Sequence, residues 1–315
     1  MTGGMTAAVV VAGLVTVLFA LLGPGQAGRL PPAVATRLLV PASLVVAGSA
    51  VWVLVAVAFT WVAQIPAVSR YGDWSAEQLR EQTPFPTVIP VACGVLALLA
   101  MGRVVRSGTR RIRILLAVRR SCHGYGPPGS LVVLDDDRPD AFATPGAHGR
   151  IVVTTGLLRA LTPDERRALI AHEAAHLRHR HAWWLLAAEL AVAANPMFAP
   201  TVRAVERAVE RWADEDAARA VTDRKLVART LARTALLIRA APPAPVRLAA
   251  TGGEVPERVR ALLRPPPRPR VVPLAILAAL LIASTVAAGT VQRRGDELLD
   301  SAGNAGTATV VRHSR

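Results

Sequence analysis

The chain has 315 residues, of which 52% are hydrophobic, and its formal net charge is +15 at pH 7. This apolar fraction is too high for an ordinary soluble domain of this size, and several long apolar runs account for it. The positive charge does not predict nucleic-acid binding, because aromatic residues make up only 4% of the chain and many arginines flank the apolar runs. Lys225 is the only lysine, which indicates a GC-rich bacterial genome more than a mechanism.

Three apolar runs predict three membrane-spanning helices in an N-terminal membrane region, residues 1–105. They cover residues 5–22, 38–62 and 88–105, each close to the ~20 residues that cross a hydrocarbon core of about 30 Å. The first run lacks a basic start and a clear cleavage site, so a cleaved signal peptide is the weaker interpretation. The polar segment 64–86 is slightly acidic and is expected to be a loop between the second and third spans.

A dense run of arginines follows the third span and sets the expected orientation. Positively charged flanks are typical of the cytoplasmic side of a membrane. A second basic segment, the Pro-rich stretch 264–270, precedes a fourth apolar run at 271–291. We therefore expect a multi-pass cell-membrane protein with its N-terminus outside and residues 106–267 in the cytoplasm. The first basic run consists of Arg103, Arg106, Arg110, Arg111, Arg113, Arg119 and Arg120.

Short β-branched segments predict a small sheet early in the region 106–267. Residues 130–134, 141–144 and 150–155 read as three strands, and we expect them to pair as a small antiparallel sheet. Three aspartates at 135–137 follow the first strand. They are compatible with a cation site, but a solvated turn is the favoured interpretation.

The next element is a helix that starts with a strong capping signal. Thr162, Pro163 and Glu165 match a capping box with proline at the first helical position. A good apolar helix former, residues 168–171, leads into the pentad HExxH at 172–176.

The pentad predicts a zinc site. On a helix, His172 and His176 lie one turn apart on the same face and can bind one zinc ion through their imidazole nitrogens. Glu173 lies beside them, where it can accept a proton from a zinc-bound water. A catalytic zinc takes three protein ligands and keeps one open position. The third ligand must come from elsewhere, and Glu210 is the best candidate.

Two more histidines follow the pentad, and their roles stay open. His179 could face the metal site, whereas His181 is better explained as a supporting or structural group. Residues 182–199 are apolar but include Glu189, so they are expected to form a core or membrane-surface helix. A hydrophobic hairpin that enters the bilayer is the alternative.

A second long helix is predicted over residues 201–221, with Glu206, Glu210 and Asp214 on one face. Helices over 224–240 and 256–263 follow it. The C-terminal region, residues 268–315, then contains the fourth span and a polar tail that is expected to be disordered.

Four segments in this order resemble the membrane zinc metallopeptidases of the HtpX and CAAX prenyl protease type: residues 141–146, 150–158, 171–176 and 210–214. The layout is also similar to the metallopeptidase domain of β-lactam sensor-transducers. The resemblance covers about residues 131–263. It implies a zinc endopeptidase of the gluzincin class, with glutamate as the third ligand.

The resemblance also implies roles for other residues. Asp214 is expected to orient a ligand histidine. Ala141, Phe142 and Ala143 match an edge strand that pairs with extended substrate.

The predicted fold class is therefore mainly α: a multi-span helical membrane protein with a zincin-like α+β metallopeptidase domain at 106–267. The predicted function is zinc-dependent peptide hydrolysis, with one Zn²⁺, a polypeptide substrate and the lipid bilayer as partners. The alternatives are a membrane regulator or scaffold with a structural or inactive zinc site, a signalling protease that cleaves a repressor, and a metal-free protein with a chance motif. Glu173 favours hydrolysis, because a structural site needs no base. The sequence specifies neither the substrate nor the oligomeric state.

Overall fold

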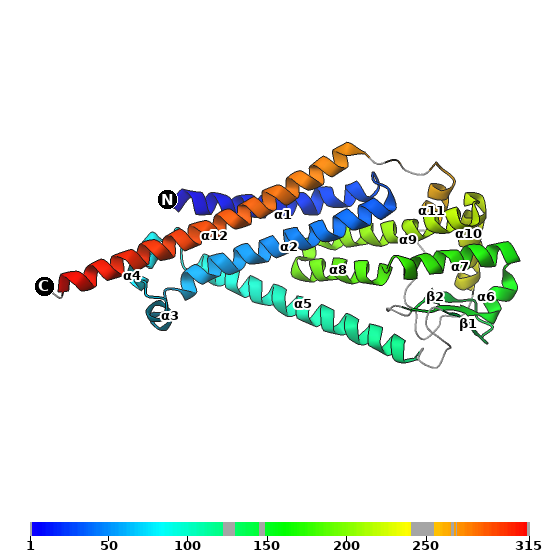
Figure 1. Cartoon of the computed structure of the whole chain (residues 1–315), viewed down its shortest axis with the longest axis horizontal. Helices are drawn as coiled ribbons and strands as arrows, with labels where there is room; N and C mark the ends of the chain where they lie inside the picture. Colours follow the sequence, from blue (N-terminus) through cyan, green and yellow to red (C-terminus); the bar gives the residue numbers. More distant parts are fainter. Residues whose placement is uncertain are drawn as a thin grey trace.

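The structure is a computed structural model that describes residues 2–121, 130–144, 149–240, 255–265, 268 and 270–313. Its long axis follows a bundle of long helices (Figure 1). Four of these helices contain a segment long and apolar enough to cross a membrane, which makes this a multi-pass membrane protein as predicted. They are α1 (Thr2–Ala27), α2 (Pro32–Val62), α5 (Val88–Ser121) and α12 (Val271–His313).

Arginines lie near the same end of the four apolar spans, and α12 also carries Arg293 and Arg294 beyond its span. Arg29 follows α1, Arg37 lies near the start of α2, Arg103 interrupts α5 and Arg270 precedes α12. The arginine-bearing ends of α1, α2 and α12 point toward the half of the molecule that contains the sheet and α7 (Figure 1). The charged side of the bundle and the pentad helix therefore lie at the same end of the molecule.

The sheet has three strands in the order β1-β3-β2. The strands are β1 (Leu131–Leu134), β2 (Ala141–Ala143) and β3 (Ile151–Thr154). β2 pairs antiparallel with β3, but β1 pairs parallel with it, so the prediction of a wholly antiparallel sheet is wrong. All four residues of β3 are buried, and this strand takes the central position. Since the chain reverses direction before β2 and again before β3, a central β3 must run parallel to β1.

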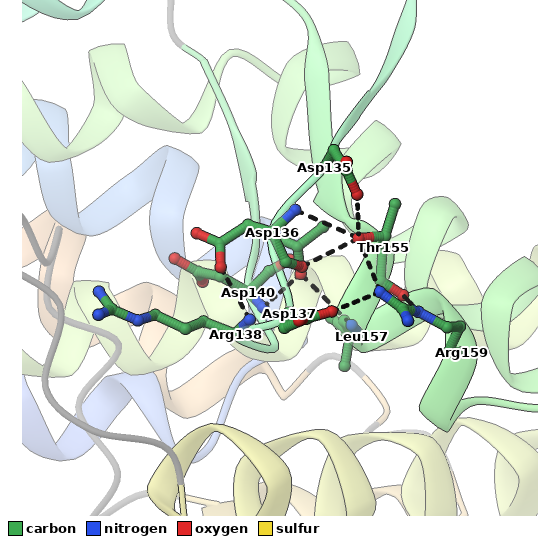
Figure 2. Close-up of polar contacts among 9 residues, drawn as sticks. Asp135, Asp136, Asp137, Arg138, Asp140, Thr155, Leu157 and Arg159 are labelled. Atoms are coloured by element: carbon green, nitrogen blue, oxygen red, sulfur yellow. Dashed lines mark hydrogen bonds and ion pairs between the residues drawn. The ribbon is translucent and has the colours of Figure 1, made fainter.

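The three aspartates after β1 form an exposed turn fastened to the start of α6 (Thr155–Ala160). The Thr155 hydroxyl donates to Asp135 and accepts from the Asp136 N–H, both at 3.2 Å, and Arg159 donates to Asp137 at 2.5 Å (Figure 2). The predicted turn is therefore the arrangement that the structure shows.

Helices fill the rest of the described chain. The capping box of α7 is present as predicted: the Thr162 hydroxyl accepts from the Glu165 N–H, and the Glu165 carboxylate accepts from the Thr162 N–H. Residues 64–86 contain two short helices, α3 (Pro66–Tyr71) and α4 (Ala76–Gln82). The remaining helices beyond the sheet are α7 (Pro163–Arg178), α8 (His181–Ala194), the 3-10 turn η1 (Pro196–Phe198), α9 (Ala199–Val221), α10 (Arg224–Ala240) and α11 (Val255–Leu262).

The hairpin of α8, η1 and α9 packs into the membrane helices. Phe198 in η1 meets Phe19 of α1 edge to face, with ring centroids 5.1 Å apart. The largest core cluster combines α1, α2, α8, α9 and α12. This hairpin is the segment whose entry into the bilayer the sequence left open. One hydrophobic core contains residues of the membrane region 1–105 and of the hairpin, which belongs to the predicted domain 106–267. The domain boundaries at 105 and 267 therefore stay a prediction.

Helix α12 continues past the predicted end of the fourth span. The expected disordered tail is wrong for residues 292–313, which are helical. The reason is a packed face: Leu298 and Ala302 are buried with Leu79 of α4 (Ala76–Gln82). The Ser301 hydroxyl also donates to the Gln82 side-chain oxygen at 2.6 Å. The basic linker 264–270 lies partly outside the described residues.

Candidate metal centre

Three side chains from two helices converge on one point. The Nε2 atoms of His172 and His176 in α7 lie 3.2 Å apart. The two carboxylate oxygens of Glu210 in α9 each lie 3.7 Å from one of these nitrogens. Within the described part of the chain, this trio is the one group of histidine, cysteine and acidic side chains found to suit a metal ion. The three predicted ligands are therefore brought together.

The spacing of the three donors fits a tetrahedral zinc ion. With zinc–ligand bonds of about 2.0–2.2 Å, the edges of a tetrahedral shell measure about 3.3–3.6 Å. The observed separations of 3.2 and 3.7 Å bracket that range, so only small side-chain movements are needed. Two imidazoles and one carboxylate are also the donor types that zinc takes in catalytic sites. The Glu210 side chain is 35% exposed, which keeps one side of the group accessible.

Asp214 lies one turn after Glu210 and holds His172. Its Oδ1 is 3.1 Å from His172 Nδ1, so Nδ1–H donates to the carboxylate and the lone pair of Nε2 faces the other donors. Burial opposes the charged form of His172, but the hydrogen bond and charge of Asp214 outweigh it and raise the pKa of the imidazole. The contact expected between Asp214 and a ligand histidine is present.

Arg258 in α11 is a site residue that the sequence did not indicate. Its guanidinium donates twice to Asp214, from Nε at 2.8 Å and from Nη2 at 2.7 Å. Its Nη1 lies 2.8 Å from Glu210 Oε2. Burial alone would raise the pKa of the Asp214 carboxyl, but Arg258 and His172 hold it well below its usual range. Asp214 therefore stays ionised and fixed between a histidine and an arginine.

His181 contacts His176, the second histidine of the candidate ligand set. Its Nδ1 lies 3.0 Å from His176 Nδ1, and its side chain is buried. Burial, with the neighbouring His176 and His179, lowers the pKa of His181 to about 3, so the ring is neutral. A neutral His181 can accept the Nδ1–H of His176, which leaves His176 Nε2 free for a metal. The expected supporting role of His181 agrees with this geometry.

His179 lies outside the group of metal donors. Its Nε2 is 2.5 Å from Asp216 Oδ2. Its ring stacks on Trp212 with centroids 4.4 Å apart. The idea that His179 faces the metal does not match this position, because the turn after α7 carries its ring toward α9 and Asp216.

Glu173 is partly buried in α7, next to His172 in the chain. Burial raises the pKa of its carboxyl, and the charges of Glu210 and Asp140 raise it further, against the opposing effect of His172 and Arg258. A carboxylate whose pKa is moved upward is better suited to accept a proton near neutral pH.

In the described part of the chain, β2 is an edge strand of the sheet and contacts α7. The Thr144 N–H donates to the Arg150 carbonyl at 2.8 Å, and the Thr154 N–H donates to the Asp140 carbonyl at 3.0 Å. In an antiparallel pair these bonds involve every second residue, so Ala141 and Ala143 turn their backbone groups away from β3. The Ala141 N–H is bonded to Asp140 Oδ1 at 2.9 Å. The N–H and C=O of Ala143 and the C=O of Ala141 therefore face the open edge.

Comparison with known proteins identifies the segment that contains the pentad. Residues 109–199 match the family described as Peptidase family M48. The chain is similar to proteins named "Protease HtpX homolog" from Acidiphilium cryptum, with 46% identity over 71 residues, and from Thermoplasma acidophilum, with 54% over 57. A third, from Aeropyrum pernix, is 47% identical over 74 residues. No solved structure matches the chain.

These similarities are local. They cover 22%, 18% and 23% of this chain and 25%, 18% and 22% of the three relatives, so the chain spans about a quarter or less of their length. The family match ends before Glu210 and Asp214, and it therefore supports the pentad helix but not the third ligand. Within those limits the resemblance drawn from the residues is confirmed, and the chain carries a peptidase family M48 segment of the HtpX type, set among membrane-spanning helices.

Proposed function

We propose that this protein is a membrane-bound zinc endopeptidase, in which His172, His176 and Glu210 hold the metal and Glu173 acts as the general base. The observation that carries the proposal is the convergence of three donors at the spacing of a tetrahedral zinc shell. The family M48 match of the pentad segment and the protease names of the relatives support hydrolysis over a purely structural metal site.

The chain's own residues divide the work of peptide-bond hydrolysis. A bound zinc ion supplies Lewis acidity, which polarises the scissile carbonyl and lowers the pKa of water to about 7. Glu173 accepts a proton from the attacking water and later delivers it to the leaving amine. Its raised pKa favours the protonated form between these two transfers. Asp214 and His181 keep the two histidines in the tautomers that turn Nε2 toward the metal.

The β2 strand supplies a way to hold a polypeptide substrate. An extended peptide can add to the open edge through the N–H and C=O of Ala143 and the C=O of Ala141. Pairing of this kind uses main-chain groups that every peptide has, so specificity depends on the side-chain positions around it. Phe142, whose backbone bonds to β3, aligns the strand rather than the substrate.

The orientation of the site in the membrane is also a proposal. Arginines at the site-bearing ends of the four candidate spans favour a cytoplasmic site. A reporter fused after Ser121 tests this directly. An extracytoplasmic signal from that fusion contradicts the orientation and leaves the chemistry of the site unaffected.

The decisive experiment measures zinc content and casein cleavage for the purified full-length chain in detergent. Wild-type protein should contain one zinc per chain, and a chelator should stop cleavage. Glu173→Gln should keep its zinc while cleavage falls by about 10²–10⁴-fold, the usual contribution of a general base. Glu206→Gln is the matched control, because Glu206 is an exposed glutamate on α9, one turn before Glu210.

Three outcomes would contradict parts of the proposal. A zinc-loaded Glu173→Gln protein that still cleaves casein removes the assigned base. Absence of zinc from the purified wild-type protein would refute the proposed metal centre. Zinc-loaded wild-type protein that cleaves neither casein nor itself favours the structural-site alternative.

A further inference from the structure

A hollow of about 610 Å³ lies where the peptidase helices meet the membrane helix α2. The end of α7, the start of α8 and the middle of α9 form its walls, and the start of α2 closes it. Its volume falls in the range of small-ligand sites, about 300–1,000 Å³. The lining residues are Arg37, Arg178, His179, Arg180, Trp183, Trp184 and Trp212.

The lining is cationic and aromatic. It includes three arginines and three tryptophans but no carboxylate. Asp216 does not line the hollow, and its carboxylate pairs with Arg178, His179 and Arg219. It therefore does not neutralise Arg37 or Arg180. Arg37 lies over the Trp212 ring at 4.6 Å. Within the described residues, neither Arg37 nor Arg180 forms an ion pair with a carboxylate, so two positive charges face the hollow uncompensated.

Arg180 occupies a backbone position that does not suit its side chain. It has φ 52° and ψ 45°, in the left-handed region, and it is the N-cap of α8 without any side-chain capping bond. Glycine or asparagine fits the left-handed region best, and serine, threonine, aspartate or asparagine fits an N-cap best. An arginine held there costs local stability, which is a common sign that the side chain has another use.

The hollow lies at the arginine-bearing end of the apolar stretch of α2. Arg37 is the last charged residue before the uncharged stretch 38–62 of α2, so its side chain marks the end of that span. Trp183 is 51% exposed beside it, in the position that tryptophans take at a bilayer interface. Basic pockets between membrane helices at this level suit anionic lipid head groups.

We propose that this hollow binds the phosphate group of an anionic phospholipid, with Arg37, Arg178 and Arg180 as its ligands. An arginine guanidinium can donate hydrogen bonds to two phosphate oxygens at once, and it can also stack on the neighbouring indole rings. The lipid places its head group against the tryptophans and its acyl chains along α2. This site is separate from the proposed metal centre and does not depend on proteolytic activity.

The test is lipid binding by the delipidated full-length protein, measured by native mass spectrometry in detergent. The probes are phosphatidylglycerol and phosphatidylcholine with identical acyl chains, and inorganic phosphate as a separate arm. We expect phosphatidylglycerol to bind more tightly than phosphatidylcholine. Arg180→Gly should weaken phosphatidylglycerol binding about fivefold, the change that corresponds to ~1 kcal/mol per basic residue at an anionic surface. Arg180→Gly combined with Arg37→Gln should weaken it about 25-fold.

The variants are chosen so that loss of folding cannot imitate the result. Glycine suits the left-handed position, so Arg180→Gly should be at least as stable to heat as wild type. Arg113→Gln on α5 is the matched control, because it removes an exposed arginine outside the hollow. Equal weakening by Arg113→Gln, or equal binding of the two lipids, overturns the proposal. Arg180-dependent binding of inorganic phosphate without any binding of phosphatidylglycerol also overturns it.

Discussion

Arg258 gives the sharpest test of how the candidate metal centre is held. Its side chain is 13% exposed, and it bonds twice to Asp214, whose side chain is 3% exposed. It also bonds to Glu210, the proposed third ligand, which lies on α9. Replacing Arg258 with glutamine keeps a polar side chain of similar reach but removes the positive charge and the two-pronged contact.

The expected cost follows from the burial of the partners. Removing one member of a buried ion pair typically costs about 3–5 kcal/mol, because the other charge remains desolvated and unpaired. The Asp214 contacts carry this cost, whereas the contact with the 35% exposed Glu210 adds less. Loss of a group that orients metal ligands usually weakens metal binding by about 10–100-fold. We therefore expect Arg258→Gln to lower thermal stability clearly and zinc affinity by one to two orders of magnitude.

The assay is zinc competition with a chromophoric chelator, together with thermal unfolding in detergent with and without added zinc. Arg260→Gln is the control, because Arg260 is exposed on the same short helix. A variant Arg258→Gln that binds zinc within about twofold of wild type would refute the view that Arg258 holds the ligands, since the expected loss is at least about tenfold. If Arg260→Gln weakens zinc binding to the same degree, the loss in Arg258→Gln results from disturbance of α11 as a whole and not from the Arg258 contacts.

Three further predictions follow from single contacts. Glu210→Ala should abolish zinc retention in elemental analysis while Glu206→Ala keeps it, and the reverse pattern would show that the wrong glutamate is assigned. Ala143→Pro should raise the KM for peptides about 2–10-fold with little change in folding, because it removes one edge-facing N–H donor; an unchanged KM would exclude substrate pairing there. Burial raises the pKa of the Glu165 carboxyl, but hydrogen bonds from the Thr162 N–H and Arg233 outweigh burial and lower it. The stability that ionised Glu165 contributes is therefore present above about pH 4.3 and is lost as pH falls through its lowered pKa. Glu165→Gln should therefore be less stable at neutral pH by about 1 kcal/mol, and thermal scans should show this difference shrinking as pH falls through the lowered pKa of Glu165.

Local patterns in the sequence predict much of the site. The HExxH spacing places His172 and His176 on one face of a helix wherever that helix lies, and the Thr162 capping box marks where the helix begins. The four spans are equally local, since each is a continuous apolar run with arginine at one end. Glu210 is a step further, because its place in the donor group depends on how α9 packs against α7. The sequence nominated Glu210 as the best candidate, and the resemblance to HtpX-type peptidases added that a glutamate is the third ligand in that class.

The features that the sequence did not indicate depend on contacts between distant segments. Arg258 lies 44 residues after Asp214, and no helical or strand period links the two positions. The parallel pairing of β1 with β3 results from the burial of β3 in the centre of the sheet. Strand propensity indicates which residues form strands but not the order of the strands in the sheet. Helical continuation of α12 depends on Leu298 and Ala302 packing on α4, although the surrounding tail is polar in composition.

Helix α9 links the proposed metal centre mechanically to the membrane bundle. Its first turns, with Thr201 and Val205 buried, belong to the core formed with α1 and α2. Glu210 lies nine residues after Thr201, about 14 Å along the same helix at 1.5 Å per residue. A straight helix has no loop in which to absorb a shift, so movement of its first turns displaces the carboxylate relative to the histidines of α7. The two imidazoles are fixed to each other by one helix, whereas the third donor is positioned by the packing of α9 against both α7 and the membrane spans. The geometry of the proposed metal shell therefore depends on the membrane helices as well as on the pentad helix.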